Sequence, residues 1–556
     1  MFHTLGSDLS TMEQKKLPLA SQRHPRTGYT LKFYGTRARS TLGCLCCRRR
    51  KKKCDEKYPT CSGCEKRDLK CEWPEKSKNG VKKTIAKTQS QPAKRDLQMT
   101  LTSPISPDSC IDPQLPLDHS ISLSSKSSPD LFELFHLPYD NMLFGRALPQ
   151  LDETGFEYLS HYSDAFCSSI PIGTDASNYF LKTFMHLAQS RDSILYALCA
   201  WGGFYLQLRD KSSIEYAKPW NYMQKAAKLI CKEIGDNLTP STNEDFFVLF
   251  AFYLIFIGIE VTTGDVCHWG GFMTQCSNLI NSFGGLAAVC QMFSNNNDIK
   301  WLLHNFQFHD LLSSNALRKG TFIPIEEYKD VLKEDVDYGI DPLQGALGRV
   351  YNLFGEIGNA QVRLRRQWNE LQDALPIIND ERCIEYEDAR RNYFEDVRAT
   401  FKEFSVKIET CQPSELHLEI LESNPFDLAL QTKLFQLYVL ICQIHLHTGV
   451  IHSPPASFQQ QDLLFRALEL IDELIETRMV VSLSLSLLVC GITCCTDYDR
   501  ERMRERFKKA QSTYFVQNLT RIEETVEEAW VRNPDGSAVV DWAALAEEKG
   551  WNLYVG

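Results

Sequence analysis

Residues 44–71 read CLCCRRRKKKCDEKYPTCSGCEKRDLKC, a stretch in which cysteine recurs in two equal halves. The spacing is C-x2-C-x6-C-x6-C-x2-C-x6-C, formed by Cys44, Cys47, Cys54, Cys61, Cys64 and Cys71. A C-x2-C turn brings two thiolates to one face, and zinc takes four such soft ligands in a tetrahedron. Two separate four-cysteine sites would need eight cysteines, so six cysteines predict two zinc ions that share two bridging thiolates.

A run of six consecutive cations follows the second cysteine of this pattern. They are Arg48, Arg49, Arg50, Lys51, Lys52 and Lys53. Like charges repel one another, so the run indicates contact with a polyanion that neutralises it. The same run suits a nuclear import signal. A charge run that is merely solvated is the alternative, and the sequence leaves it open.

This stretch, residues 43–73, resembles the Zn2Cys6 binuclear cluster of fungal transcription regulators. The resemblance rests on the cysteine spacing, the basic run, Pro59 between the third and fourth cysteines, and the Cys-x-Lys-Arg segment from Cys64 to Arg67. It implies that Cys44 and Cys61 are the bridging ligands. It gives each ion two further ligands, Cys47 and Cys54 for one, and Cys64 and Cys71 for the other.

The resemblance also implies how DNA is read. In the family, the third and fourth residues after the second cysteine meet the bases of a CGG triplet, and these positions are Arg50 and Lys51 here. The remaining cations of the run then mainly meet phosphates; they are Arg48, Arg49, Lys52 and Lys53.

Three other interpretations of the cysteines are weaker. Cys46 lies inside the first C-x2-C pair, where the family usually has a residue that does not bind metal, and a shifted register would let Cys46 compete for zinc. Its C-x-C spacing fits the repeat less well. A disulfide framework would suit a small secreted domain, but we expect no signal peptide. A C-x-x-C redox pair does not account for two equal triplets.

Charge is divided unequally along the 556 residues. Residues 1–95 hold 24 Lys and Arg against 8 Asp and Glu, a net +16, which leaves −26 for the remainder. A basic head on an acidic body predicts that the head meets a polyanion and the body does not. The chain is too long for one compact domain.

Composition places the boundaries of the expected regions. The composition of residues 1–43 predicts a disordered basic N-terminus. Residues 44–73 are predicted to form the zinc module. Residues 74–130 predict a disordered linker rich in Lys, Ser and Pro, because 76–130 hold no aromatic residue and 14 of residues 101–130 are Ser or Pro. No heptad pattern persists there, so dimerisation through this segment is left open. Residues 130–144 fit either an acidic-hydrophobic activation segment or the first docked segment of the next domain.

From residue 150 to 556 the apolar periodicity is helical, which predicts a large all-helical C-terminal domain and a mostly α fold. Ile194, Leu198, Trp201, Tyr205 and Leu208 fall on one helix face. The run 246–259, FFVLFAFYLIFIGI, is short for a membrane span and predicts a buried core helix, so no membrane contact is expected. Loops are expected to be richest at 290–345 and 372–425.

This region resembles the fungal-specific transcription factor domain found in regulators of lysine and arginine biosynthesis and of sterol uptake. The resemblance rests on FFVLFAFYLIFIGIEVTTGD (246–265), His268-Trp269, FGGL (283–286), VEEAW (526–530), DW (541–542) and GWNLYVG (550–556). It implies a regulatory domain whose partners include the transcription machinery.

No catalytic constellation is apparent, so we expect no enzyme. His445 and His447 are two residues apart and point to different helix faces, which favours core or surface histidines over a metal site. Two functional hypotheses remain. One is a nuclear regulator of RNA polymerase II transcription that binds double-stranded DNA. The other is a receptor whose helical pocket takes a sterol or metabolite effector. A homodimer, the target genes and the sign of regulation are left undecided.

Overall fold

The computed structural model describes residues 45–46, 57, 59–67, 69–71, 151–172, 178–210, 217–264, 266–294, 296–314, 316, 318–335, 337–374 and 383–556. The chain divides into two units, one of residues 16–124 and one of the rest. The described part of the first unit contains the short helix α3 (Ser62–Glu65), and Leu45 and Cys46 are also helical. The described part of the second unit is helical and contains no β-strand, which confirms the mostly α fold.

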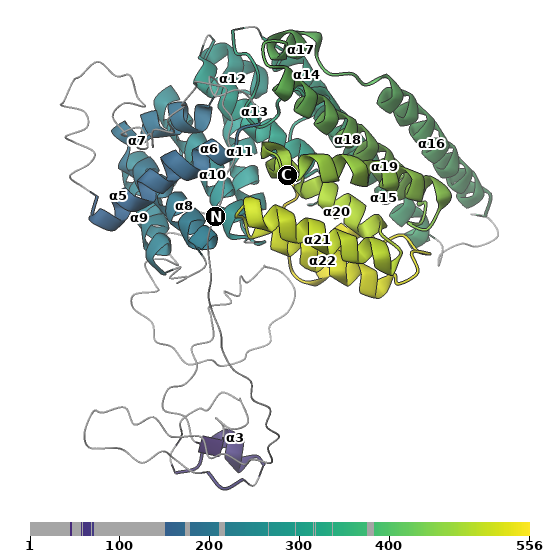
Figure 1. Cartoon of the computed structure of the whole chain (residues 1–556), viewed down its shortest axis with the longest axis horizontal. Helices are drawn as coiled ribbons and strands as arrows, with labels where there is room; N and C mark the ends of the chain where they lie inside the picture. The colour runs from purple at the N-terminus through teal and green to yellow at the C-terminus, as the bar shows by residue number, and fades with distance from the viewer. Residues whose placement is uncertain are drawn as a thin grey trace, which may run out of the picture. The chain divides into compact units, whose positions relative to one another are not determined.

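The helices of the second unit fall into two groups in Figure 1, one coloured blue to teal and one green to yellow. The first group is α5 (Glu153–His161), α6 (Cys167–Ser169), α7 (His186–Ser190), α8 (Asp192–Asp210), α9 (Ala217–Ile234), α10 (Asn243–Thr263), α11 (Trp269–Ser282), α12 (Leu286–Met292), α13 (Asn297–Leu312) and α14 (Ile325–Val331). Two π-helical turns interrupt it, at Tyr162–Phe166 and Phe180–Met185.

Helix α10 is the predicted core helix. Thr242 and Asp245 form a capping box at its start, and Gly264, with φ of 64°, ends it in the left-handed conformation. The helix is long and apolar enough to cross a membrane by length and composition, but 78% of its most apolar 18-residue window is buried in this unit. The burial confirms the prediction of a core helix.

Helix α8 is buried more completely than the sequence predicts. The periodicity indicated one apolar face, whereas 14 of the 19 residues are buried. Gly202 allows α5 to approach closely, since a Cβ there would lie 2.0 Å from the carbonyl oxygen of Tyr158. The Trp201 indole donates a 2.8 Å hydrogen bond to the hydroxyl of Thr262 on α10. Neighbouring helices therefore cover α8 on nearly every side.

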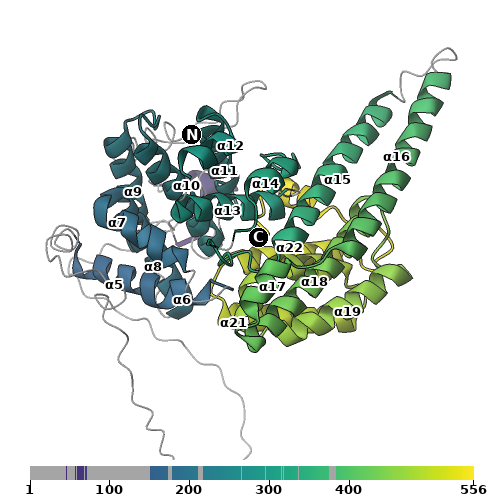
Figure 2. The ribbon, with the colours of Figure 1, turned by 90° about the horizontal axis from the view of Figure 1, so that it is seen from above.

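The second group begins with a long antiparallel pair, α15 (Gly348–Ala374) and α16 (Cys383–Thr410). Figure 2 shows this pair projecting beyond the other helices. The expectation of loops across 372–425 was wrong, because α16 occupies most of that range. Its buried apolar residues Tyr393, Val397, Phe404 and Ile408 recur at helical spacing. They form a narrow stripe on an otherwise polar helix, whose main contacts are with α15 and α18.

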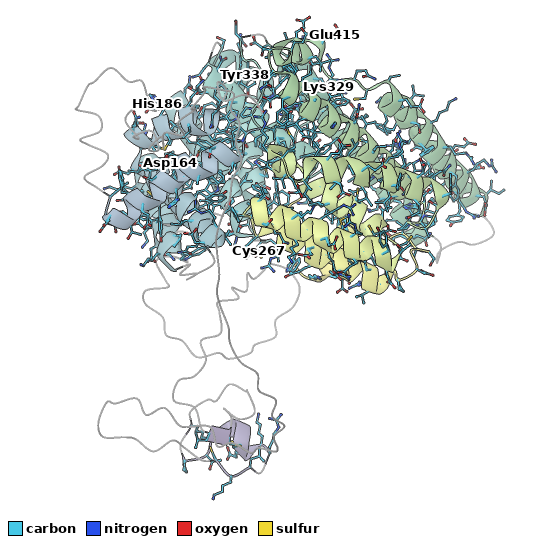
Figure 3. All side chains as sticks on the ribbon, in the orientation of Figure 1. Asp164, His186, Cys267, Lys329, Tyr338 and Glu415 are labelled. Carbon is cyan, nitrogen blue, oxygen red and sulfur yellow. The ribbon has the colours of Figure 1, made fainter. Side chains whose placement is uncertain are left out.

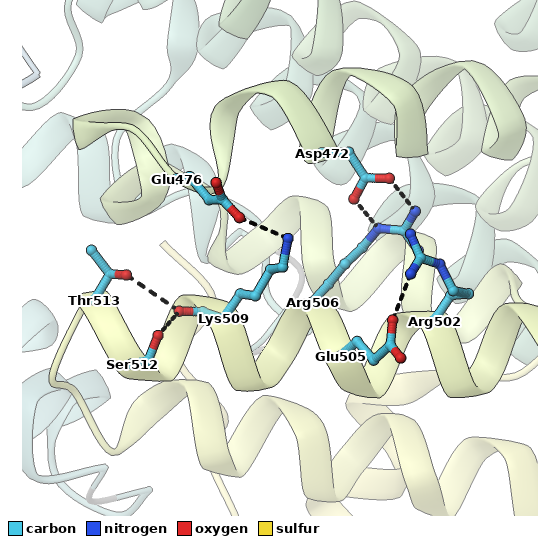
Figure 4. Close-up of polar contacts among 8 residues, drawn as sticks. All are labelled: Asp472, Glu476, Arg502, Glu505, Arg506, Lys509, Ser512 and Thr513. Atoms are coloured by element: carbon cyan, nitrogen blue, oxygen red, sulfur yellow. Dashed lines mark hydrogen bonds and ion pairs between the residues drawn. The ribbon is translucent and has the colours of Figure 1, made fainter. Parts of the chain in front are cut away.

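The remaining helices complete the second group. They are α17 (Glu415–Leu421), α18 (Pro425–Gly449), α19 (Phe458–Leu474), a 3-10 turn (Arg478–Ser482), α20 (Ser484–Thr493), α21 (Asp497–Thr513), α22 (Asn518–Arg532) and α23 (Trp542–Glu548). Figure 4 shows how α21 is held to α19 by charge pairs, including Lys509 with Glu476 at 2.7 Å.

The C-terminal residues join the two groups. The Trp269 indole donates to the carbonyl of Asn552 at 2.6 Å, and the amide of Asn552 donates to the carbonyl of Val266 at 2.6 Å. Tyr554 is buried and hydrogen-bonded to His309 on α13. Leu553, Tyr554 and Val555 of the GWNLYVG segment are thus part of the core, which explains their apolar character.

Candidate zinc centre and DNA-binding module

Three predicted zinc ligands converge in the first unit. The Sγ atoms of Cys61, Cys64 and Cys71 all lie within 4.8 Å of one another. A tetrahedral site with Zn–S bonds of about 2.3 Å separates its sulfurs by roughly 3.8 Å, so the three thiols fit one zinc site. Cys61 and Cys64 are fully buried and Cys71 is partly buried, which protects the site from solvent.

Local backbone geometry positions these thiols. The amides of Cys64 and Glu65 both donate to the carbonyl of Cys61 at 2.9 Å, which forms the turn that opens α3. The amide of Cys61 lies 3.4 Å from Sγ of Cys71 and donates to it. Hydrogen bonds from N–H groups stabilise a negatively charged sulfur, so the backbone is arranged for a thiolate ligand.

Cys46 occupies a different position. Its side chain is partly buried and packs against the buried pair Cys61 and Cys64. Within the described part of this unit, the group of mutually close thiols comprises Cys61, Cys64 and Cys71, and Cys46 lies outside it. Its packing therefore places an additional thiol beside the zinc centre.

The other predicted site residues cannot be placed. Cys44, Cys47 and Cys54 lie outside the described residues, as do the six cations Arg48, Arg49, Arg50, Lys51, Lys52 and Lys53. The described part of the second half presents Lys66, Arg67 and Lys70 as exposed cations beside the thiols. A positive surface therefore adjoins the metal site.

The second unit contains a large polar recess, about 610 Å³ in volume, near α14, α15 and α17. Lys329 and Tyr338, labelled in Figure 3, belong to its lining. Arg349 donates two hydrogen bonds to Glu334, at 2.9 and 3.2 Å, and Ser414 donates to the same carboxylate at 2.6 Å. These side chains satisfy one another's hydrogen-bonding groups. The recess is lined by residues of both loops and helices.

A smaller cavity of about 160 Å³ lies among α15, α18, α20 and residues 539–543. Its lining includes Arg365, His445 and His452. Of these residues the sequence singled out His445 but not Arg365. The sequence signal that could have found Arg365 is its position directly after Leu364, an apolar residue that is buried.

Buried titratable groups in this unit have shifted pKa values. Burial lowers the pKa of His309 to about 3, and burial with Arg365 nearby lowers the pKa of His445 to about 4. Burial raises the pKa of Asp310 to about 7, although Tyr328 and two backbone amides donate hydrogen bonds to it. His445 stacks on Phe354 with ring centroids 4.7 Å apart. These contacts make the groups part of the core.

Comparison with known families identifies both units. The model of the fungal Zn(2)-Cys(6) binuclear cluster domain matches residues 42–80, and that of the fungal specific transcription factor domain matches residues 157–556. The chain belongs to the fungal Zn2Cys6 transcription factors. A domain of this kind binds two zinc ions through its cysteines, and the converging thiols agree with that. The Zn2Cys6 protein is thus a DNA-binding regulator of transcription.

Two relatives match nearly the whole chain. One is the "Uncharacterized transcriptional regulatory protein C965.10" of Schizosaccharomyces pombe, 27% identical over 93% of this chain and 97% of its own. The other is the "Transcriptional activator protein UGA3" of Saccharomyces cerevisiae, 22% identical over 92% of this chain and 97% of its own. No solved structure matches the Zn2Cys6 protein.

Proposed function

We propose that this protein is a nuclear, sequence-specific regulator of RNA polymerase II transcription whose zinc cluster reads CGG-type triplets. The observation that supports it most directly is the convergence of the Cys61, Cys64 and Cys71 thiols beside exposed cations. The basic run of residues 48–53 precedes this site in the sequence. Double-stranded DNA is the polyanion that such a surface suits.

The full ligand set is the one that the family resemblance implies. Cys44 and Cys61 would bridge the two ions, Cys47 and Cys54 would complete one site, and Cys64 and Cys71 the other. Zinc supplies the cross-links that a segment this short needs in place of a hydrophobic core. The cysteines therefore set the shape of the module, and the cations set what it binds.

Base reading is assigned to two residues of the basic run. In the proposal, a short helix follows Cys47; it would not fill a major groove along its length, so its end would supply the base contacts. Arg50 and Lys51 would donate to O6 and N7 of guanine, which are paired acceptors in that groove. Arg48, Arg49, Lys52 and Lys53 would contact phosphates, which position the module but carry no sequence information.

Each proposed region has its own function. Residues 44–73 bind DNA, residues 74–130 link this module to the helical domain, and residues 150–556 carry the regulatory and partner-binding surfaces. The net −26 beyond residue 95 supports a body that does not bind DNA. Contacts with the transcription machinery, and with a second copy if the protein is a homodimer, would then lie on the helical domain.

Titration of two variants tests the base-reading proposal. Lys51→Ala should weaken binding to a CGG duplex by roughly 1–3 kcal/mol and flatten the preference over a scrambled duplex. Lys53→Ala should weaken both duplexes alike and reduce the salt slope by about one unit. Equal losses for both variants on both duplexes would mean that all six cations are interchangeable phosphate binders.

A second candidate function is reception of a small-molecule effector by the helical domain. The cavity among α15, α18 and α20 supports it. At about 160 Å³ this cavity is below the several hundred Å³ typical of ligand sites for larger molecules, and the 610 Å³ recess is polar. These two cavities therefore favour a small metabolite over a sterol.

A further inference from the structure

The cavity beside Arg365 is lined by residues of α15, α16, α18 and α20, labelled in Figure 1, with Trp368 and Tyr393 as aromatic members of its walls. Leu364, Ile444, Val489 and Ile492 contribute aliphatic side chains, and Val540 covers one side from the loop before α23. Its volume of about 160 Å³ is close to the ~150 Å³ of an engineered cavity that takes up benzene. A ligand of similar size would fit without rearrangement of the helices.

One cation in this lining is incompletely paired. Nη2 of Arg365 lies 3.4 Å from Asp541, and Arg318 lies 3.5 Å from the same carboxylate. Among the described residues, the buried Nη1 of Arg365 has no hydrogen-bond partner. Arg318 has a further partner in Glu547 at 3.1 Å, whereas Arg365 relies on the shared Asp541. The two guanidinium groups are thus matched by two carboxylates, and the unsatisfied group at this site is the Nη1 donor of Arg365.

The other polar groups of the lining are satisfied or neutral. Gln361 donates to the carbonyl of His445 at 3.0 Å, and Thr493 donates to the carbonyl of Val489 at 2.7 Å. Burial lowers the pKa of both His445 and His452, which keeps these rings uncharged near neutral pH. Arg365 and Asp541 are the charged side chains of the described lining.

Backbone strain gathers at the same place. In the described part of the chain, the non-glycine residues with positive φ are Leu238, Arg318 and His452. Two of the three adjoin this site, His452 in the lining and Arg318 on Asp541. Residues held in the left-handed region are over-represented at ligand sites, so the strain agrees with the unsatisfied guanidinium.

We propose that this cavity binds a small organic monocarboxylate with a short aliphatic body, anchored by the guanidinium of Arg365. The planar fork of an arginine matches a carboxylate in two parallel hydrogen bonds. The aliphatic walls contact the aliphatic body of the ligand. A neutral ligand would not supply the carboxylate that the guanidinium of Arg365 lacks. Phosphate fits less well, because a single arginine in an apolar cavity offers it too few donors.

The monocarboxylate is the proposed ligand of the second candidate function, the effector receptor. Only the regulatory role of the ligand rests on that function. Binding itself is independent of DNA. If a carboxylate binds without changing the affinity for DNA, the proposed site is supported and the receptor role is contradicted. Absence of binding would remove the site and leave base reading by the zinc module unaffected.

Melting of the full chain in the presence of isovalerate, with isovaleramide as its neutral isostere, tests the proposal. Isovalerate near 100 times its dissociation constant should raise the melting temperature by about 2–4 °C, and the amide should not. Arg365→Met should abolish the shift. Arg366→Gln is the matched control, because its side chain is 83% exposed and pairs with Glu370 on the surface; it should retain the shift.

A cavity-filling variant separates loss of the site from loss of the fold. Val540→Phe keeps Arg365 and should also abolish the shift, while helical circular dichroism shows that the chain is folded. Equal stabilisation by the acid and the amide would overturn the proposal, as would an unchanged shift in Arg365→Met. Folded wild-type protein that butyrate, isovalerate and 4-methylpentanoate all fail to stabilise at millimolar concentration would overturn it too.

Discussion

Arg506 on α21 donates two parallel hydrogen bonds to Asp472 on α19, each 2.7 Å long. The arginine side chain is only 8% exposed, whereas the aspartate is 41% exposed, so the pair lies at the edge of the core (Figure 4). Bidentate geometry and partial burial make this contact stronger than an ordinary surface pair. It joins α21 to α19 beside the buried apolar residues Met503 and Phe507 of α21.

Removal of the aspartate should therefore destabilise the helical domain. Asp472→Ala leaves a buried guanidinium without its carboxylate, and we expect a loss of about 2–3 kcal/mol in the free energy of unfolding. Lys509→Ala, which breaks the exposed pair with Glu476, should cost less than about 1 kcal/mol. Urea unfolding followed by circular dichroism measures both. Equal losses would show that burial of Arg506 does not matter.

Packing of α5 on α8 depends on the absence of a side chain at Gly202. A Cβ there would meet the backbone of Tyr158 at 2.0 Å, and a backbone atom cannot move aside as a flexible side chain can. We expect Gly202→Ala to cost about 3 kcal/mol of stability. Gly348→Ala is the control, since its Cβ would meet only the end of the Gln344 side chain at 3.3 Å. A melting temperature unchanged by Gly202→Ala would contradict the close approach.

Acid should destabilise the helical domain through its buried histidines. The pKa of His445 falls from 6.5 to about 4 on burial, so the folded state disfavours the proton that the unfolded chain takes up. The contribution of neutral His445 to the free energy of unfolding is fully present above about pH 6.5. As the pH falls from 6.5 towards 4, roughly 3 kcal/mol of this contribution is lost. His445→Phe should reduce the difference between urea midpoints at pH 7 and pH 5. A replacement at the exposed His186 (Figure 3) is the control.

Zinc stoichiometry tests the ligand assignment. The isolated 40–75 peptide should bind two zinc ions and be largely unfolded without them, because metal binding and folding are coupled. Cys61→Ser should lose both ions, since Cys61 is assigned as a bridge. Cys46→Ser should lose neither, because its thiol lies outside the group of Cys61, Cys64 and Cys71. Loss of zinc in Cys46→Ser, measured by mass spectrometry under native conditions, would require a different register.

The sequence alone determined what depends on local spacing. The C-x2-C repeats predict the thiol triad because a turn of that length brings its two ends together. The apolar run 246–259 predicts a buried helix, and α10 is that helix. The family followed from the same local patterns, and the comparisons confirmed it.

Only the tertiary structure decided what depends on residues far apart in the chain. Arg365 and Asp541 meet across 176 positions of sequence separation, and no periodicity predicts that encounter. Helix α16 was missed because its apolar stripe of Tyr393, Val397, Phe404 and Ile408 is narrow and most of its other residues are polar, whereas the structure shows the helix packed against α15 and α18. Local patterns report which side chains must be buried, whereas partners across the domain depend on how the buried faces fit together.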